Sequence, residues 1–465
     1  MSDSKDLVII GSGPGGYVAA IRAAQLGMRV AVVEKDPRFG GTCLHRGCIP
    51  TKALLHTATV LDQARNADRF GVVVGDASLD LGKAQSYKQG VVDKNAAGIE
   101  FLFEKNKIEG IHGHGRLISA TEVEVQGSAG GVRTLSARFV LIATGSVPRE
   151  VPMAPTDAVQ VVNSDHILNV DRVPESLVVI GSGAVGSEFA SIFHSFGAKV
   201  TLVEMLPRIL PLEDEEVSKE LARSFKKRGI KVKTETRLTG IELGSKGVTV
   251  RLERAGGAES LAAEMLLVAI GRAPVTEGIG LEEAGVIVEK GYIQVNRTMQ
   301  SSVPNVYAIG DVVPTPWLAH VASAEGILAA EHMAGEKTYP LNYDQMPSVT
   351  YCEPEVGSVG LSEAEARERG YDVAVGKFPF SASGKAAIEG KTSGFVKVVR
   401  ETKHDELLGV HIIGPKATDL IAEACVALKI ESTTEELFRT IHAHPTLSEA
   451  MAEAAHAASG HAIHI

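Results

Sequence analysis

The sequence predicts an α/β protein in which one strand–turn–helix–strand unit occurs twice, followed by a smaller C-terminal domain of the α+β class. Residues 7–34 and residues 177–204 align without a gap, at the constant offset that separates Gly11 from Gly181. Each copy starts with an apolar run, passes through a glycine-rich turn and ends in a second apolar run closed by a glutamate. Beyond about residue 345 the pattern changes to alternating apolar residues and one helical stretch, which predicts the third domain.

The glycine-rich turn of each copy reads G-x-G-x-x-G directly after a strand, which is the fingerprint of a Rossmann-like dinucleotide-binding domain. The first glycine permits the tight turn, the second lets the backbone approach a pyrophosphate at the helix N-terminus, and the third allows close helix–strand packing. These positions are Gly11, Gly13 and Gly16 in the first copy and Gly181, Gly183 and Gly186 in the second. One such motif is a weak signal, but two in the same context predict two bound dinucleotides.

The acids that close the two copies are Glu34 and Glu204, and both are expected to accept hydrogen bonds from a ribose hydroxyl. Glu204 would repel a 2′-phosphate, although Arg208 stands nearby. The second copy is therefore predicted to prefer NAD to NADP.

Several further runs predict individual elements. Residues 138–149, 265–276 and 305–312 each read as a strand followed by a glycine turn, and are expected to be chain crossings at the edges of the two dinucleotide domains. In the last domain, residues 394–400 and 407–414 alternate as strands do, and residues 419–430 have the pattern of a helix.

Composition limits the class of protein. A chain of 465 residues with 44% hydrophobic and 22% charged residues is typical of a soluble globular protein with two to four domains. A net charge of −10 argues against nucleic-acid binding. No apolar run reaches the roughly 18–20 residues of a membrane span, and the N-terminal MSDSKD has no signal-peptide pattern. A cytoplasmic location is expected, with no membrane and no nucleic-acid partner.

The four cysteines are too few for a disulfide framework in a chain of this size. Two of them, Cys43 and Cys48, stand in GGTCLHRGCIPTK just behind the first fingerprint. No second Cys or His pair follows at ligand spacing, so no metal site is predicted. Cys43 and Cys48 are then either buried structural cysteines or a reversible redox-active disulfide, and the redox-active disulfide is favoured. Cys352 and Cys425 match no redox motif and are predicted to pack as small apolar side chains.

Over essentially its whole length the chain resembles the pyridine nucleotide-disulfide oxidoreductases, and among them most closely the dihydrolipoamide dehydrogenases. The resemblance is carried by GSGPGG (11–16), GGTCLHRGCIPTK (40–52), ATG (143–145), GSGAVGSE (181–188), GRAP (271–274), AIGD (308–311), LAHVASAEG (318–326) and HAHPTLSE (442–449). It implies an FAD-binding domain over residues 1–150, an NAD-binding domain over 151–275, a segment completing the FAD domain over 276–345, and a dimerisation domain over 346–465.

The resemblance places FAD on the first fingerprint and NAD on the second. Asp311 would bond the ribityl chain of the flavin, and residues 318–320 would begin a helix whose N-terminal amides face the flavin pyrimidine. The FAD residues implied are Gly11, Gly13, Pro14, Gly15, Gly16, Glu34, Lys35, Gly41, Thr42, Lys52, Ala143, Thr144, Gly145, Gly310, Asp311, Ala319 and His320. Those implied for NAD are Gly181, Gly183, Ala184, Val185, Gly186, Glu188, Glu204, Gly271 and Arg272.

The resemblance also implies a catalytic set. Cys48 would lie against the flavin as the charge-transfer thiolate, while Cys43 would be the interchange thiol that exchanges with substrate. Lys52, one turn beyond Cys48, would approach flavin N5, with Glu188 as its ion-pair partner.

A base and its orienting carboxylate follow from the same resemblance. These are His444 and Glu449, and the proline after His444 distinguishes it from His442. Since the dimerisation domain forms the subunit interface in this family, each site would borrow His444 from the other subunit, and an obligate homodimer is expected.

The function implied is oxidation of protein-bound dihydrolipoyl groups with reduction of NAD, through a Cys43–Cys48 disulfide and FAD. The partners would be lipoyl-bearing acyltransferases of 2-oxoacid dehydrogenase complexes or the lipoyl carrier protein of glycine cleavage. A reductase for glutathione or another small disulfide is the alternative, disfavoured by Glu204 and by the segments at 318–320 and 442–450. A non-catalytic binding subunit is disfavoured because the cysteines and the His–Glu pair are intact.

One departure from the family pattern stands between the two cysteines. The usual Asn-Val is replaced by His45 and Arg46. This basic pair could stabilise a nearby thiolate or face solvent, and the second reading is favoured.

Overall fold

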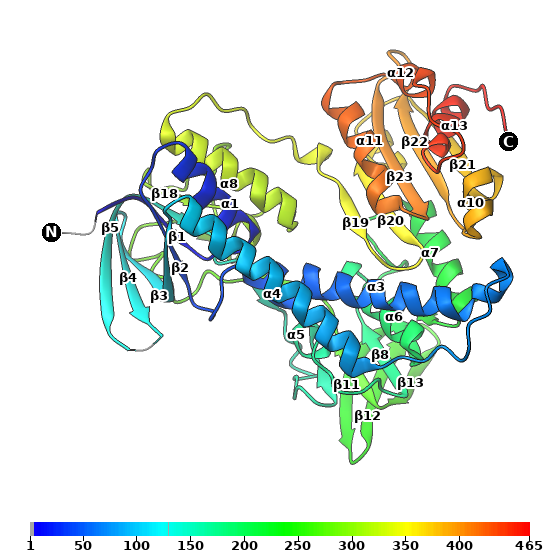
Figure 1. Cartoon of the computed structure of the whole chain (residues 1–465), viewed down its shortest axis with the longest axis horizontal. Coiled ribbons are helices and arrows are strands. Elements are labelled where there is room, and N and C mark those ends of the chain that lie inside the picture. Colours follow the sequence, from blue (N-terminus) through cyan, green and yellow to red (C-terminus); the bar gives the residue numbers. More distant parts are fainter. Residues whose placement is uncertain (1–3, 129) are drawn as a thin grey trace. The chain divides into compact units, whose positions relative to one another are not determined.

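The computed structural model describes residues 4–128 and 130–465, and the chain forms two compact units, each assembled from three separate segments. The first unit comprises Met1–Ala53, Gly82–Arg149 and Arg272–Tyr343. The second comprises Leu54–Leu81, Glu150–Gly271 and Asp344–Ile465. Figure 1 traces the elements of both.

A parallel sheet forms the centre of the first unit. Its strands lie in the order β3 (Glu109–Ser119), β2 (Val30–Glu34), β1 (Lys5–Ile10), β5 (Val132–Ile142) and β18 (Val306–Ala308). Helices α1 (Pro14–Gln25) and α8 (Ala319–Ala334) pack against each other beside it (Figure 1). The packing is close because Gly15 and Gly326 face each other, with no room for a Cβ atom between the two backbones.

The ends of β3 and β5 extend beyond the parallel sheet. Together with β4 (Glu122–Gly127) they form a three-stranded antiparallel sheet. The remaining elements of the first unit are α2 (Gly41–Arg46), most of α4 (Leu81–Lys105), and the short strands β6 (Ser146–Pro148), β15 (Arg272–Pro274), β16 (Val288–Glu289) and β17 (Tyr292–Ile293). Helix α3 (Cys48–Arg65) begins in this unit and continues into the second.

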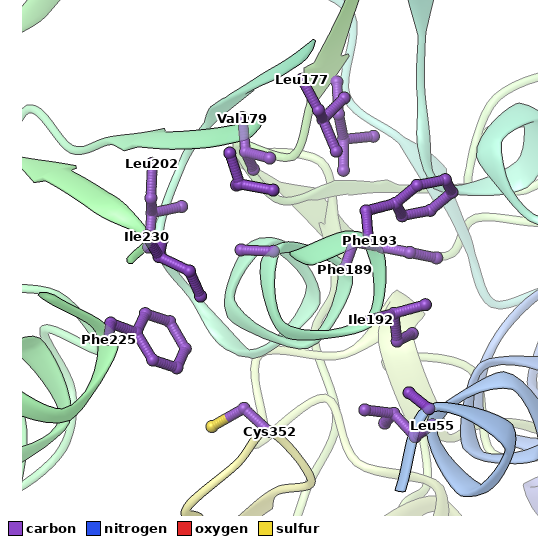
Figure 2. Close-up of a cluster of buried hydrophobic side chains, with 14 of the residues drawn as sticks. Leu55, Leu177, Val179, Phe189, Ile192, Phe193, Leu202, Phe225, Ile230 and Cys352 are labelled. Carbon is purple, nitrogen blue, oxygen red and sulfur yellow. The ribbon is translucent and has the colours of Figure 1, made fainter. Parts of the chain in front are cut away.

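The second unit repeats the parallel arrangement. The strand order is β10 (Lys231–Lys233), β9 (Lys199–Val203), β8 (Ser176–Ile180), β14 (Met265–Val268) and β7 (Val161–Val162). It also holds α5 (Ser164–Ile167), α6 (Ala184–Phe196), α7 (Glu215–Arg228) and an antiparallel meander of β11 (Arg237–Gly244), β12 (Gly247–Arg254) and β13 (Gly257–Ala263). Figure 2 shows its core, where Phe189, Ile192 and Phe193 of α6 lie among side chains of the sheet, α7 and α3.

Residues after 344 add a five-stranded sheet to the second unit. The order is β19 (Ser348–Thr350), β20 (Glu355–Gly360), β23 (Leu407–Gly414), β22 (Phe395–Glu401) and β21 (Val373–Pro379), all antiparallel. Helices α11 (Ala417–Lys429) and α13 (Glu449–Ala458) share one apolar cluster with β22 and β23. The short helices are α9 (Glu363–Glu368), α10 (Gly384–Glu389) and α12 (Thr434–Arg439).

The α/β fold class and its repeated unit are confirmed. The expected strands near residues 140, 267, 307, 397 and 410 are present, as is the helix over 417–429. Cys352 is buried in the core shown in Figure 2, and Cys425 packs against the cluster beneath α11, both as predicted. Among the described residues no helix is long and apolar enough to cross a membrane. The three domain boundaries stay a prediction.

Candidate active site

The two glycine-rich turns have the same geometry. Gly11 and Gly181 have positive φ, and a Cβ atom on either would lie 2.2 or 2.4 Å from a carbonyl oxygen, that of Ala143 or Ala269. The third glycines, Gly16 and Gly186, face the carbonyl of the first at 2.1 and 1.9 Å from a built Cβ. The turn and its helix can therefore pack this closely only with glycine at these positions.

The middle glycines are different. Gly13 and Gly183 are the N-caps of α1 and α6, and a Cβ atom on either would meet nothing within 4 Å. Each helix N-terminus thus points its unsatisfied amides into open space. This is a cradle that a pyrophosphate fits, because the partial positive charge of the helix end attracts an anion.

The closing acids take part in the turns. Glu34 accepts hydrogen bonds through Oε2 from the amide and hydroxyl of Ser12, at 2.9 and 2.5 Å. Glu204 accepts the same two bonds from Ser182, at 2.9 and 2.7 Å. Both carboxylates are almost fully buried, so the acids are held rigidly beside their turns.

A second acidic group lies in the first unit. Asp311 accepts a hydrogen bond from Ser146 Oγ, and burial raises the pKa of Asp311 against the opposing effects of Ser146 and Arg272. Arg272, which sequence reasoning assigned to NAD, donates to Ser146 Oγ and to the Ser146 carbonyl, each at 2.6 Å. The reason is that β15 pairs with β6, which brings Arg272 opposite Pro148 and its side chain onto Ser146.

Sequence reasoning missed Glu325. It lies in α8 without solvent exposure and accepts hydrogen bonds from the Gly310 amide at 2.7 Å and the Tyr343 hydroxyl at 3.0 Å. Burial raises the pKa of Glu325. The signal available was an acid inside the otherwise apolar face of LAHVASAEG, since a buried carboxyl needs such partners.

The other predicted cofactor residues lie at turns and helix starts. Pro14 and Gly15 open α1, Ala184 and Val185 open α6, Gly41 and Thr42 open α2, and Ala319 and His320 open α8. Lys35 follows β2, Ala143, Thr144 and Gly145 follow β5, and Gly271 precedes β15. The expected helix after Leu318 is therefore present.

The two motif cysteines flank a break between helices. Cys43 lies inside α2, Cys48 is the first residue of α3, and Gly47 separates the two helices. Both side chains are thiols, and Cys43 is hydrogen-bonded to Cys48. That hydrogen bond raises the pKa of Cys43, burial and the negative charge of Cys48 raise it further, and the positive charge of Lys52 lowers it. The pair can form a disulfide with little movement, because the thiols are already in contact.

Lys52 and Glu188 lie in different units. Lys52 is in the second turn of α3 and acts electrostatically on Cys43. Glu188 is buried in α6 and accepts a hydrogen bond from the Tyr351 amide at 3.0 Å. Their ion pair stays a prediction.

His444 and Glu449 are joined in the second unit. Nδ1 of His444 lies 2.8 Å from Glu449 Oε1, and the imidazole is 78% exposed. Burial pushes the pKa of Glu449 upward, but the Thr446 amide and the His444 ring outweigh it, so that the pKa lies below its ordinary value. An ionised Glu449 holds a proton on Nδ1 and leaves Nε2 as an acceptor facing outward.

His45 and Arg46 both contact the segment that follows β2, and an effect of this basic pair on a thiolate stays a prediction. His45 Nε2 contacts the Phe39 carbonyl at 2.9 Å, and Arg46 forms an ion pair with Asp36 at 2.6 Å. The expectation that the pair simply faces solvent is wrong for Arg46, because Asp36 lies within reach at the end of β2.

No cluster of three or more His, Cys, Asp or Glu side chains among residues 4–128 and 130–465 is arranged to hold a metal ion.

Comparisons with known proteins agree with this geometry. Residues 5–326 match the family model described as pyridine nucleotide-disulphide oxidoreductase, and residues 346–455 match the model for the dimerisation domain of that family. The chain is 47% identical to a dihydrolipoyl dehydrogenase of Bacillus subtilis over 100% of both sequences. It is 48% identical to one of Thermus scotoductus, over 99% of this chain and 98% of the relative. A crystal structure of LpdA from Mycobacterium tuberculosis superposes with a TM-score of 0.91 at 27% identity, over 97% of this chain and 98% of that one.

Proposed function

The chain belongs to the pyridine nucleotide-disulphide oxidoreductase family, and from that membership we propose that it oxidises protein-bound dihydrolipoyl groups and reduces NAD. The observation that carries the proposal is the contact between Cys43 and Cys48 directly behind the first cradle. Members of the family use FAD and NAD, so the chemistry is disulfide exchange coupled to two dinucleotides.

FAD is assigned to the first cradle and NAD to the second. The open space at Gly13 and at Gly183 fits a pyrophosphate in each case. Glu34 and Glu204 are placed to receive ribose hydroxyls, and Asp311 is assigned to the ribityl chain. When bound, FAD supplies a two-electron acceptor between the thiols and NAD.

The residues of this chain carry out the thiol chemistry. Nε2 of His444 takes the proton of one substrate thiol, and the resulting thiolate attacks Sγ of Cys43 in the oxidised pair. The Cys43–Cys48 bond breaks and Cys48 leaves as a thiolate, stabilised by the positive charge of Lys52. The first substrate sulfur is now in a mixed disulfide with Cys43. The second thiol of the substrate then attacks that first substrate sulfur. This closes the substrate disulfide and returns Cys43 as a thiol that carries the second proton.

We further propose a homodimer in which each cysteine pair uses His444 from the other copy. Support comes from the match of residues 346–455 to the family's dimerisation domain and from the outward-facing ring of His444. The partners assigned are lipoyl-bearing acyltransferases of 2-oxoacid dehydrogenase complexes, or a lipoyl carrier protein, in the cytoplasm. The domain boundaries at residues 150, 275 and 345 belong to the same proposal.

The test is steady-state oxidation of NADH by the purified protein with lipoamide, compared with glutathione disulfide and with NADPH. Rapid turnover is expected with NADH and lipoamide alone. Cys43→Ser and His444→Gln should each reduce it at least about a hundredfold, the size of a general-base or nucleophile contribution. Faster turnover of glutathione disulfide would replace the substrate assigned here.

A further inference from the structure

Arg46 ends helix α2, three residues after Cys43, and its side chain reaches back to the segment that follows β2. Its Nη2 lies 2.6 Å from Asp36 Oδ2, and the contact is partly buried. Burial raises the pKa of Asp36, but Arg46, assisted by Lys35, outweighs burial and keeps that pKa below its ordinary value. Arg46 thus pairs with Asp36, and the positive charge of Lys52 lowers the pKa of Cys43.

Asp36 connects Arg46 to the first cradle. The Asp36 amide donates to Glu34 Oε1 at 2.9 Å, while Oε2 of Glu34 holds Ser12. Ser12 Oγ in turn accepts a hydrogen bond from the amide of Gly40, at 3.0 Å. Gly40 is the N-cap of α2, so both ends of this short helix are attached to the same acid.

The second copy of the repeat provides an internal comparison. Glu204 accepts the equivalent amide bond at 2.9 Å, but the donor is Leu206, which has no carboxylate to bind a cation. Arg208 donates instead to the Pro211 carbonyl at 3.1 Å. The Arg46–Asp36 ion pair is therefore not part of the turn that the two copies share. It occurs only in the first copy, which precedes the two motif cysteines.

We propose that Arg46 is a positioning residue, which through Asp36 couples the acid assigned to the FAD ribose, Glu34, to the helix that carries Cys43. The inference rests on the proposed placement of FAD in the first cradle. Seating the dinucleotide at Glu34 then also fixes α2, and with it the sulfur that exchanges with substrate. Arg46 performs this role because its long side chain and planar guanidinium group can hold the Asp36 carboxylate. Its charge is not required to act on the thiols.

The experiment compares Arg46→Met, Asp36→Asn and the double variant with the unaltered chain. Two quantities are measured: the FAD dissociation constant of the apoprotein and the hydrogen exchange of the α2 amides, residues 41–46, with and without FAD. In the unaltered chain FAD should protect these amides. Each single variant should lose most of that protection and weaken FAD binding roughly three- to tenfold, and the double variant should be no worse than either.

The matched control is Arg29→Met. Arg29 forms an ion pair with Asp6 at 3.1 Å, at the opposite end of β2 from Glu34. Its replacement should leave the FAD dissociation constant and the exchange of the α2 amides unchanged. Full FAD-dependent protection of α2 in Arg46→Met, or additive losses in the double variant, would overturn the proposal.

Alkylation of Cys43 as a function of pH separates positioning from a charge effect. Arg46→Met and Asp36→Asn both break the ion pair, but only the first removes the cation, so positioning predicts the same midpoint in the two variants. Midpoints that shift in opposite directions would mean that the charge of Arg46 acts on the thiols directly, which overturns the proposal. Failure of the unaltered apoprotein to take up FAD would instead reject the proposed function and, with it, this inference.

Discussion

His442 and Glu423 form a second histidine–carboxylate pair, two residues ahead of His444 and at a distance of 2.7 Å. The other ring nitrogen of His442 lies 2.9 Å from the Thr440 carbonyl. Both ring nitrogens of His442 are therefore engaged, one by a carboxylate and one by a backbone carbonyl. The side chain of His442 is only 9% exposed, in contrast to that of His444. His442 therefore anchors the loop, and His444 is the ring that remains open to substrate.

Replacing His442 with Gln should reduce kcat about tenfold, because the loop that carries His444 loses its attachment to α11. The acid limb of the pH–rate profile should also move to higher pH. Burial raises the pKa of Glu449, while the Thr446 amide, His444 and His442 lower it. Removing His442 removes one lowering effect, so Glu449 takes up a proton at higher pH.

The measurement is a pH–rate profile of His442→Gln, Glu423→Gln and the double variant. Coupling predicts that the double variant is no slower than the slower single variant. His464→Gln is the control, since this histidine forms a similar pair with Glu453 at 2.6 Å but is 69% exposed at the C-terminus. A profile of His442→Gln that overlays that of the unaltered enzyme would contradict the prediction.

Replacing Gly183 by Ala should affect NADH binding, whereas replacing Gly186 by Ala should affect the stability of the fold. Gly183→Ala should leave the free energy of unfolding within about 0.5 kcal/mol, because the methyl enters open space. It should raise the KM for NADH strongly, since it occupies the place where the α6 amides face the pyrophosphate. Gly186→Ala should cost about 1–3 kcal/mol, because its Cβ would lie 1.9 Å from the Gly181 carbonyl oxygen.

Thermal unfolding and NADH kinetics of the two glycine variants separate these effects. If Gly183→Ala bound NADH as the unaltered enzyme does, the second cradle would not hold the pyrophosphate.

Glu204→Gln should reduce the preference for NADH over NADPH by roughly tenfold or more, since it removes the negative charge that repels a 2′-phosphate. Gln still offers one oxygen to Ser182, so the turn should survive. The matched variant Glu34→Gln should weaken FAD retention and leave the nucleotide preference unchanged. The ratio of kcat/KM for the two nucleotides is measured, and an unaltered ratio in Glu204→Gln would show that another residue sets it.

Lys397→Met should lower the free energy of unfolding of the second unit by about 3–5 kcal/mol at neutral pH. The Lys397 side chain on β22 is 2% exposed, and its ammonium group lies 2.9 Å from Asp214 and 3.0 Å from both Glu216 and Glu363. Burial alone would lower the pKa of Lys397, but these three carboxylates raise it to about 12. Its loss leaves three carboxylates without their buried cation.

The sign of the pH dependence follows from the two partners. Burial raises the pKa of Asp214, but nearby positive groups, His411 and Lys397, hold it below its ordinary value. Stability from Asp214 is therefore present at neutral pH and lost as pH falls through its lowered pKa, while that from Lys397 is lost only as pH rises through about 12. The cost of Lys397→Met should shrink toward about pH 4, where the uncompensated carboxylates become protonated.

Hydrogen exchange of the β22 and β23 amides measures this cost at pH 7 and near pH 4. Lys377→Met is the control: this lysine also binds Glu216, at 2.6 Å, but is 44% exposed and should contribute no more than about 1 kcal/mol. Equal losses from the two variants would contradict the prediction.

Much of the fold was predictable because its signals are local. The spacing of Gly11, Gly13 and Gly16, repeated at Gly181, specifies a turn between a strand and the helix that follows it directly in sequence. Likewise, the mainly apolar run of residues 407–414 predicted β23, and all eight of its residues are buried.

The partners of charged side chains were less predictable, because strand pairing and helix packing bring them from distant segments. Arg272 follows Gly271 in sequence, but the pairing of β15 with β6 places it on Ser146, which precedes it by more than a hundred residues. Glu423 on α11 contacts His442, which follows α12, and no periodicity indicates that contact. The contact between Arg46 and Asp36 was not predictable for the same reason, because the distance between these residues depends on how the chain returns from β2 to α2.

The two cradles have nearly the same turn, down to the serine that each acid holds. With a dinucleotide in each as proposed, an inhibitor that imitates only the shared adenosine and pyrophosphate would compete at both sites. Selectivity has to be sought two residues further along the chain, at Asp36 in the first copy and Leu206 in the second. An apolar substituent directed at that position would favour the second site, because the first carries the Asp36–Arg46 ion pair there.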